Sequence, residues 1–294
     1  MGITRRAAFK AMLAGGAAVA GVSAATRPVS AAPLEAPADA LGLLYDATLC
    51  IGCKTCVVKC QEANHLEPDT SGIDAKYNAP LSLSANAKTV IKIYKGDEGE
   101  SYMKAQCMHC IDPACVTACM IGALTKGPNG IVAYNVDYCV GCRYCEIACP
   151  FNVPKFQWAS NTPQIVKCEL CRERLGEGKE PACTEVCPRH AVIFGKRAEL
   201  LQEAKRRIAA APDTYQPKVY GETEAGGTQC LYISHVPFDK LGLPTLDDRP
   251  APELARNIQH TVYKGFIAPV ALYGILGAVM LRNRRSADKP EAES

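Results

Sequence analysis

The sequence predicts an α+β protein in which one small structural unit occurs twice, and three observations lead to this fold class. Sixteen of its 17 cysteines fall in four groups of four within residues 50–187. Short runs of β-forming residues, bounded by turn residues, lie between and after these groups. A segment of strong helix formers follows at residues 197–210. Because the cysteine groups repeat, we expect the fold around them to repeat as well.

The predicted strands are short. Residues 89–94 form a strand that ends at the turn residues 96–99. Residues 123–125 and 131–134 are two strands around the turn at 126–130, which predicts a hairpin.

The remaining elements follow the last cysteine group. Strands are expected at 191–194 and 230–234. In the helix at 197–210, Leu200, Ala204 and Ile208 recur every four residues and mark its buried side. The rest of residues 211–256 is rich in Pro and Gly, and we expect it to be irregular.

The composition limits the function. The formal net charge is +3, too close to neutral to indicate a nucleic-acid partner, and 21% charged residues are normal for a folded chain. We find no nucleophile-and-base constellation and no nucleotide-binding glycine motif, so no substrate-converting site is predicted.

The cysteine spacing carries the chemistry. The four groups are Cys50, Cys53, Cys56 and Cys60; Cys107, Cys110, Cys115 and Cys119; Cys139, Cys142, Cys145 and Cys149; and Cys168, Cys171, Cys183 and Cys187. The first and third have the spacing C-x2-C-x2-C-x3-C, which is that of bacterial ferredoxins. The second has four residues in its middle gap, and the fourth has eleven. We therefore predict two bacterial-ferredoxin-like modules that hold four [4Fe–4S] clusters.

The geometry of a cubane cluster explains this spacing. Three thiolates on one tight loop can bind three irons, and the fourth cysteine reaches a neighbouring cluster. We expect that fourth cysteine to begin a helix that points away. Proline follows Cys149 and Cys187, whereas Gln61 and Met120 take its place in the other two groups.

The cysteines allow two other interpretations. A secreted chain with many cysteines can form disulfides, but a disulfide framework rarely repeats one tight group of four. C-x2-C pairs also bind zinc, which would make the chain a structural scaffold between a membrane and an enzyme. A zinc site would not explain the fourth cysteine of each group, which follows the third after three residues, or the prolines that follow two of the groups.

Single residues near the groups allow more than one role. We expect Cys230 to be a small buried side chain, and we favour packing over cluster tuning for His109. For His260 we favour anchoring at a membrane interface over a place near a quinone or haem. Cations beside the ligands either raise the reduction potentials or are solvated or paired: Lys54, Lys59, Arg143, Lys167, Arg172 and Arg189.

Both ends of the chain predict export and membrane attachment. Arg5 and Arg6 precede a weakly apolar stretch and a small-residue site that ends near Ala31, as in a twin-arginine signal. An ordinary secretory signal is the alternative, but the twin-arginine route carries folded proteins with their clusters in place. Gly265–Leu281 lacks charges and precedes three arginines, which predicts a membrane helix with a cytoplasmic C-terminus.

The chain resembles the four-cluster iron–sulfur subunits of exported respiratory enzymes, such as formate dehydrogenase, dimethyl sulfoxide reductase and hydrogenase complexes. Within that family it is most similar to the hydrogenase-2 type. The segments that carry the resemblance are Leu44–Cys50, Gln106–Cys110, Tyr144–Lys155, Lys167–Cys171, Ala191–Gly195 and Asn257–Gly265.

The resemblance implies a ligand set for each cluster, and ferredoxin geometry predicts the same pairing. The sets are Cys50, Cys53, Cys56 and Cys187; Cys60, Cys168, Cys171 and Cys183; Cys107, Cys110, Cys115 and Cys149; and Cys119, Cys139, Cys142 and Cys145. The implied partners are the small and large subunits of a [NiFe] hydrogenase, an integral membrane subunit that reacts with quinone, and membrane lipid. A molybdenum or tungsten enzyme is the alternative partner.

The sequence predicts seven segments along the chain. The N-terminal part has a signal peptide at 1–31 and then a linker, the first cysteine group and an insertion at 32–100. The cysteine modules continue with groups two and three at 101–160 and with the fourth group, which completes the other module, at 161–200. A helix and docking segment at 201–256, the membrane helix at 257–282 and a cytoplasmic tail at 283–294 follow. The bulk of the protein is then expected on the periplasmic side of the inner membrane.

Overall fold

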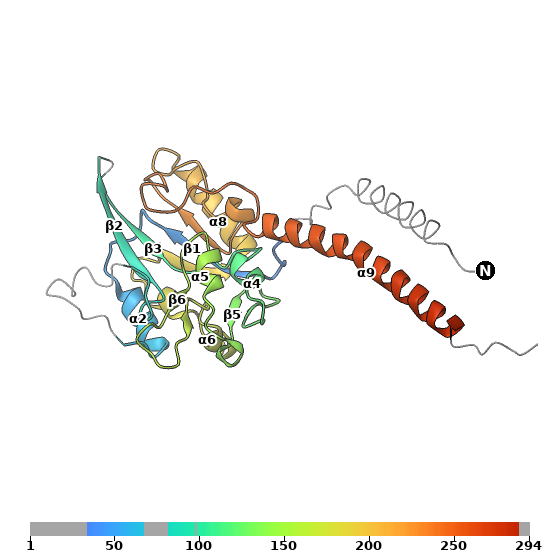
Figure 1. Cartoon of the computed structure of the whole chain (residues 1–294). Helices are drawn as coiled ribbons and strands as arrows, with labels where there is room; N and C mark the ends of the chain where they lie inside the picture. Colours follow the sequence, from blue (N-terminus) through green and yellow to red (C-terminus); the bar gives the residue numbers. More distant parts are fainter. Residues whose placement is uncertain (1–33, 68–81, 98, 288–294) are drawn as a thin grey trace, which may run out of the picture. The chain divides into compact units, whose positions relative to one another are not determined.

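The computed structural model describes residues 34–67, 82–97 and 99–287 (Figure 1). The described residues fall in two units, a body within Pro33–Pro252 and a second unit that contains helix α9 (Glu253–Ala287). The predicted signal peptide at 1–31 lies outside the described residues, as do the middle of the first insertion and the last seven residues of the predicted tail.

A three-stranded sheet organises the body. Strand β1 (Leu41–Asp46) lies between β8 (Val192–Lys196), which is antiparallel to it, and β9 (Cys230–Ile233), which is parallel. The strands expected at 191–194 and 230–234 are therefore present, whereas β1 was not predicted. Because β1 precedes the first cysteine group and β8 follows the fourth, their pairing brings these two distant groups together.

The two faces of this sheet pack against different partners. On one face Leu44 and Leu231 pack with Leu200 and Ala204 of α8 (Arg197–Ala210). This helix has the predicted bounds, and it contacts all three strands.

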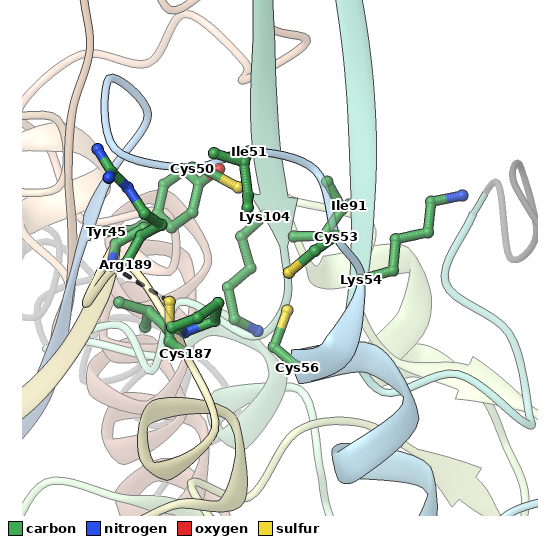
Figure 2. Close-up of a pocket in the computed structure, with 13 residues that line it drawn as sticks. Tyr45, Cys50, Ile51, Cys53, Lys54, Cys56, Ile91, Lys104, Cys187 and Arg189 are labelled. Carbon is green, nitrogen blue, oxygen red and sulfur yellow. Dashed lines mark hydrogen bonds between the residues drawn. The ribbon is translucent and has the colours of Figure 1, made fainter.

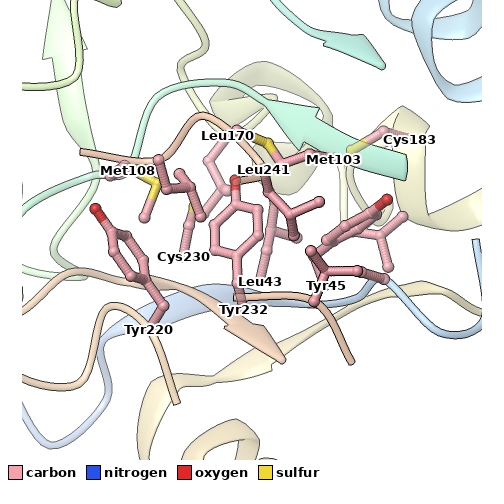
Figure 3. Close-up of a cluster of buried hydrophobic side chains, with 14 of the residues drawn as sticks. Leu43, Tyr45, Met103, Met108, Leu170, Cys183, Tyr220, Cys230, Tyr232 and Leu241 are labelled. Atoms are coloured by element: carbon pink, nitrogen blue, oxygen red, sulfur yellow. The ribbon is translucent and has the colours of Figure 1, made fainter. Parts of the chain in front are cut away.

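On the opposite face lies the core shown in Figure 3, where buried side chains meet the cysteine loops. Tyr45 and Tyr232 stand next to each other there, with ring centroids 5.5 Å apart. The sheet thus holds α8 on one side and supports the cysteine loops on the other.

Three hairpins complete the body. Strands β2 (Val90–Gly96) and β3 (Gly99–Ala105) pair around the predicted turn, so the strand expected at 89–94 is the first arm of a hairpin. The hairpin expected at 123–134 is confirmed as β4 (Leu124–Lys126) and β5 (Val132–Tyr134). A further hairpin, β6 (Lys155–Phe156) with β7 (Ile165–Val166), was not predicted. Residues 211–252 are irregular apart from β9 and a short 3₁₀ turn at Glu224–Gly226, so the irregular segment expected to reach residue 256 ends where α9 begins at Glu253.

The cysteine groups contain short helices, and here one expectation was wrong. The fourth cysteine of a group does not begin a helix. The helix contains the third cysteine and continues toward the fourth, in α2 (Thr55–Ala63), α4 (Ala114–Thr117), α5 (Tyr144–Ala148) and α7 (Ala182–Glu185). A helix rises about 1.5 Å per residue, so one turn separates the two thiols by roughly 6 Å along its axis, which lets them face different sites. The other short helices are α6 (Arg172–Gly176) and a 3₁₀ turn at Val136–Tyr138.

Helix α9 contains the predicted membrane segment, with Pro269 inside it. Among the described residues, no helix combines the length and apolarity that a bilayer crossing requires. The predicted membrane helix begins within residues 257–268, whose side chains lie outside the described part.

The sheet–helix contact can be tested at two adjacent leucines of α8. Leu200 is only 5% exposed in the apolar cluster, whereas Leu201 packs at its margin. Leu200→Ala should cost about 2–5 kcal/mol of stability because it leaves a cavity in the core. Thermal unfolding followed by circular dichroism should show a clearly lower midpoint for Leu200→Ala than for the control Leu201→Ala. Equal midpoints would contradict this packing.

Candidate functional site: four thiol sites

Twelve of the cysteines come together in three sets around separate cavities. Site 1 is formed by Cys50, Cys53, Cys56 and Cys187, and Figure 2 shows these side chains around one cavity. Site 2 is lined by Cys60, Cys168, Cys171 and Cys183. Site 4 is lined by Cys119, Cys139, Cys142 and Cys145.

The fourth predicted set, Cys107, Cys110, Cys115 and Cys149, is called site 3. Burial raises the pKa of the Cys110 thiol, and the charges of Cys107, Cys149 and Cys115 raise it further. The cavities thus bring together twelve of the sixteen cysteines in the sets expected from the sequence, and site 3 stays a prediction for the other four. No described cysteine forms a disulfide.

The donor set of sites 1, 2 and 4 fits iron–sulfur clusters, because each site brings four thiols to one cavity. Among the described residues, no three His, Cys, Asp or Glu side chains lie close enough to hold a single metal ion. Four thiols around one cavity that are too widely spaced for a single ion favour a cubane cluster over zinc.

The same backbone turn builds sites 1 and 4. In the first group Gly52 and Lys54 have φ of 68° and 58°, and in the third group Gly141 and Arg143 have φ of 70° and 63°. This left-handed conformation folds the chain sharply between successive cysteines. The Gly52 amide lies 3.5 Å from the Cys50 sulfur and donates to it. Such N–H donors stabilise negative charge on sulfur and raise the reduction potential of a bound cluster.

Burial dominates the acid–base chemistry of the thiols. It raises the pKa of Cys107 and Cys145 to about 11 and that of Cys183 to about 12. Iron binds the thiolate, so assembly of a cluster must release these protons. Cluster binding is therefore favoured as pH rises and opposed as pH falls, because the protonated thiols compete with iron.

Two buried lysines face the sites, and only one was singled out from the sequence. Lys104 of β3 lines both site 1 and site 2 and is fully buried. Burial alone would lower its pKa, but Cys183, Cys56, Cys60 and Cys168 outweigh that effect and raise it. The sequence does not single out Lys104, because it stands beside no cysteine and a lysine on a hairpin strand is usually exposed.

Lys167 belongs to the cations named from the sequence. Its ammonium donates to the carbonyl oxygens of Val132 and Cys168. Its charge lowers the pKa of Cys107 and Cys115, although burial has the larger, opposite effect on both. Lys167 is thus placed to act on site 3.

The other cations named from the sequence mostly have partners inside the protein. Lys59 pairs with Glu62, and Arg172 pairs with Glu169. The Arg143 guanidinium lies 4.5 Å from the centre of the Trp158 ring. Lys54 and Arg189 line site 1.

The single residues are placed as follows. Cys230 is buried as expected, and its thiol donates to the Cys107 carbonyl oxygen at 3.2 Å. His109 is fully buried, and its Nδ1 accepts from the Val132 amide at 3.0 Å. This bond leaves the proton on Nε2, which has no hydrogen-bond partner among the described residues. The side chain of His260 lies outside the described part.

Comparisons with known proteins agree with this site. Residues 100–197 match the family described as a 4Fe-4S dicluster domain. The chain is 42% identical over 281 residues to the hydrogenase-2 operon protein HybA of Escherichia coli O157:H7, covering 84% of this chain and 85% of that protein. It is 35% identical over 243 residues to the iron–sulfur subunit of the nitrate-inducible formate dehydrogenase of Escherichia coli K12, covering 79% of this chain and 80% of that subunit.

Cysteine-lined cavities on a ferredoxin-like framework, together with the dicluster match, define an iron–sulfur electron-transfer protein. The level of identity then gives the family. The chain belongs to the family of HybA-like iron–sulfur subunits, to which the formate dehydrogenase iron–sulfur subunits are related.

The turns at sites 1 and 4 differ in the space beside their glycines. A Cβ on Gly52 would lie 2.1 Å from the Tyr102 ring, whereas a Cβ on Gly141 would lie 3.4 Å from Phe156. Both Gly52→Ala and Gly141→Ala incur the left-handed cost, roughly 1–2 kcal/mol. Because Gly52→Ala must also displace Tyr102, we expect it to lose more iron than Gly141→Ala in anaerobically purified protein. Equal iron content in the two variants would contradict this geometry.

Proposed function

We propose that this chain carries electrons through four [4Fe–4S] clusters, one in each thiol site. The observation that carries the proposal is the linear order of the sites. Helix α2 contains both Cys56 of site 1 and Cys60 of site 2, and α7 contains Cys183 of site 2 and ends two residues before Cys187 of site 1. Helices α4 and α5 likewise contain the third cysteine of their groups and end just before the fourth, which belongs to the other site of the pair. Thiols one helical turn apart imply clusters close enough for electron hopping.

The link between the two pairs of sites comes from site 2 and site 3. Gln106 lines site 2 and is followed in the chain by Cys107 of site 3, so the two sites are adjacent. The sites therefore follow the order 1, 2, 3 and 4. Cys53 of site 1 and Cys142 of site 4 are exposed, so electrons would enter and leave at these two ends.

The catalytic partner in this proposal is a [NiFe] hydrogenase of the hydrogenase-2 type, with its small and large subunits. The support is the 42% identity to a protein whose name places it in the hydrogenase-2 operon. Electrons would pass along sites 1 to 4 between the hydrogenase and an integral membrane subunit that reacts with quinone. Hydrogen oxidation would send them toward quinone, and the reverse reaction would send them back. The chain itself would convert no substrate.

The location in this proposal is the periplasmic face of the inner membrane. Arg5 and Arg6 support export by the twin-arginine route. The uncharged run Gly265–Leu281, followed by arginines, supports a single C-terminal membrane helix. In the isolated chain, several apolar side chains of α9 are exposed, including Tyr273 at 73% and Met280 at 72%. Lipid or a membrane subunit would cover them.

A formate dehydrogenase is the second candidate partner, and the 35% identity to such an iron–sulfur subunit favours it specifically. Purification of the full-length chain from native membranes separates the two candidates. Co-purification of nickel–iron subunits supports the hydrogenase, and a molybdenum or tungsten subunit supports the alternative. A colourless preparation that contained zinc and no iron would reject the electron-transfer function altogether.

The cluster assignment makes a sharp prediction for two cysteines. Cys53→Ala should remove up to roughly a quarter of the iron, because Cys53 belongs to one of four cluster sites. Cys230→Ala is the control and should keep the full iron content, because Cys230 lines none of sites 1, 2 and 4, and of the site 3 cysteines its thiol bonds only the main-chain carbonyl of Cys107. Iron and acid-labile sulfide per chain, measured under nitrogen, check both. Equal losses in the two variants would contradict the assignment.

A further inference from the structure

A single buried lysine lies between two of the thiol sites. Lys104 is fully buried in β3 and lines both site 1 and site 2. Figure 2 shows its side chain running through site 1 toward Cys56. Its ammonium donates to Thr89 Oγ1 and, at 2.7 Å, to Gln106 Oε1. Both acceptors are neutral, so these bonds satisfy two of the three N–H donors without offsetting the charge.

A buried ammonium requires negative charge nearby, because an unpaired ion in a protein interior is costly. The groups that supply it are cysteines of both sites, Cys56 from site 1 and Cys60, Cys168 and Cys183 from site 2. The hairpin that carries Lys104 continues directly into the loop of site 3. One module thus places a cation inside the other, where two sites share it.

We propose that Lys104 sets the reduction potentials of the clusters in sites 1 and 2 together, by placing one positive charge between them. The inference rests on the proposed electron-transfer function. When one electron moves between the two sites, one cluster is oxidised and the other reduced, and no proton moves or bond changes. The positive charge favours the reduced, more negative state at either site, so it raises both potentials.

This arrangement has a consequence for electron flow. A cation beside only one site would favour the electron there and slow its onward transfer. A cation that faces both sites raises both potentials and leaves the difference between them nearly unchanged, so it does not trap the electron at either site. Lys104 thus acts on the two clusters through its charge and does not carry the electron itself.

The test is a redox titration of the full-length chain in its native complex, followed by electron paramagnetic resonance. Lys104→Met should lower the midpoint potential of two centres and leave the others unchanged. We expect at least a tenfold change in the ratio of reduced to oxidised centres at a fixed potential, which equals about 59 mV for one electron. Lys92→Met is the matched control, since Lys92 lies exposed on the paired strand β2. The Lys92→Met variant should leave the midpoint potential of every centre unchanged.

Two further variants cover the case in which Lys104→Met loses iron. Lys104→Gln keeps a polar side chain without charge, and Lys104→Arg keeps the charge. Loss of iron from the Met and Gln variants with full iron in Arg would support a required charge. Loss of iron from all three variants would assign Lys104 to packing and overturn the inference. Full iron with unchanged midpoint potentials would also overturn it, and so would an equal shift in the potential of every centre. Wild-type protein without reducible iron would instead reject the proposed function.

Discussion

The four-residue step from the third to the fourth cysteine of each group is the constraint on which this structure depends. Helix α2 contains Cys56 of site 1 and Cys60 of site 2, whereas α7 contains Cys183 of site 2 and ends two residues before Cys187 of site 1. The two helices therefore connect the same pair of sites from opposite directions, although they lie more than a hundred residues apart. The fold must bring these distant helices together before either site is complete.

The three-stranded sheet meets this requirement. Strand β1 enters the first cysteine group and β8 leaves the fourth, and their antiparallel pairing fixes the two loops side by side. Strand β9 completes the sheet, and helix α8 buries its other face, where Leu44, Leu200 and Leu231 pack together. The irregular segment after α8 thus has a structural role, because it supplies β9. A sheet with apolar contacts on one face and thiols on the other supports the sites without contributing ligands.

Much of this could be predicted from the sequence, because cysteine spacing and short-range patterns are local signals. The helix at Arg197–Ala210 and the hairpin at β4 and β5 followed from such signals. Strand β1 was missed because its residues, Leu41–Asp46, show no alternation: nearly every position is buried between two packed faces. Its parallel partner β9 comes almost 190 residues later, and no local pattern encodes a pairing over that distance.

Lys104 shows the same limit at the level of the site. The cations named from the sequence were chosen because they adjoin cysteines in the chain, and two of them, Lys59 and Arg172, pair with neighbouring carboxylates instead. Lys104 adjoins no cysteine, yet it is the lysine that two thiol sites share. The electrostatics of a multi-cluster protein are set by charges that the fold carries into the interior. A positive charge in the interior requires negative charge nearby, and the cysteines of two sites would supply it as thiolates once clusters are bound.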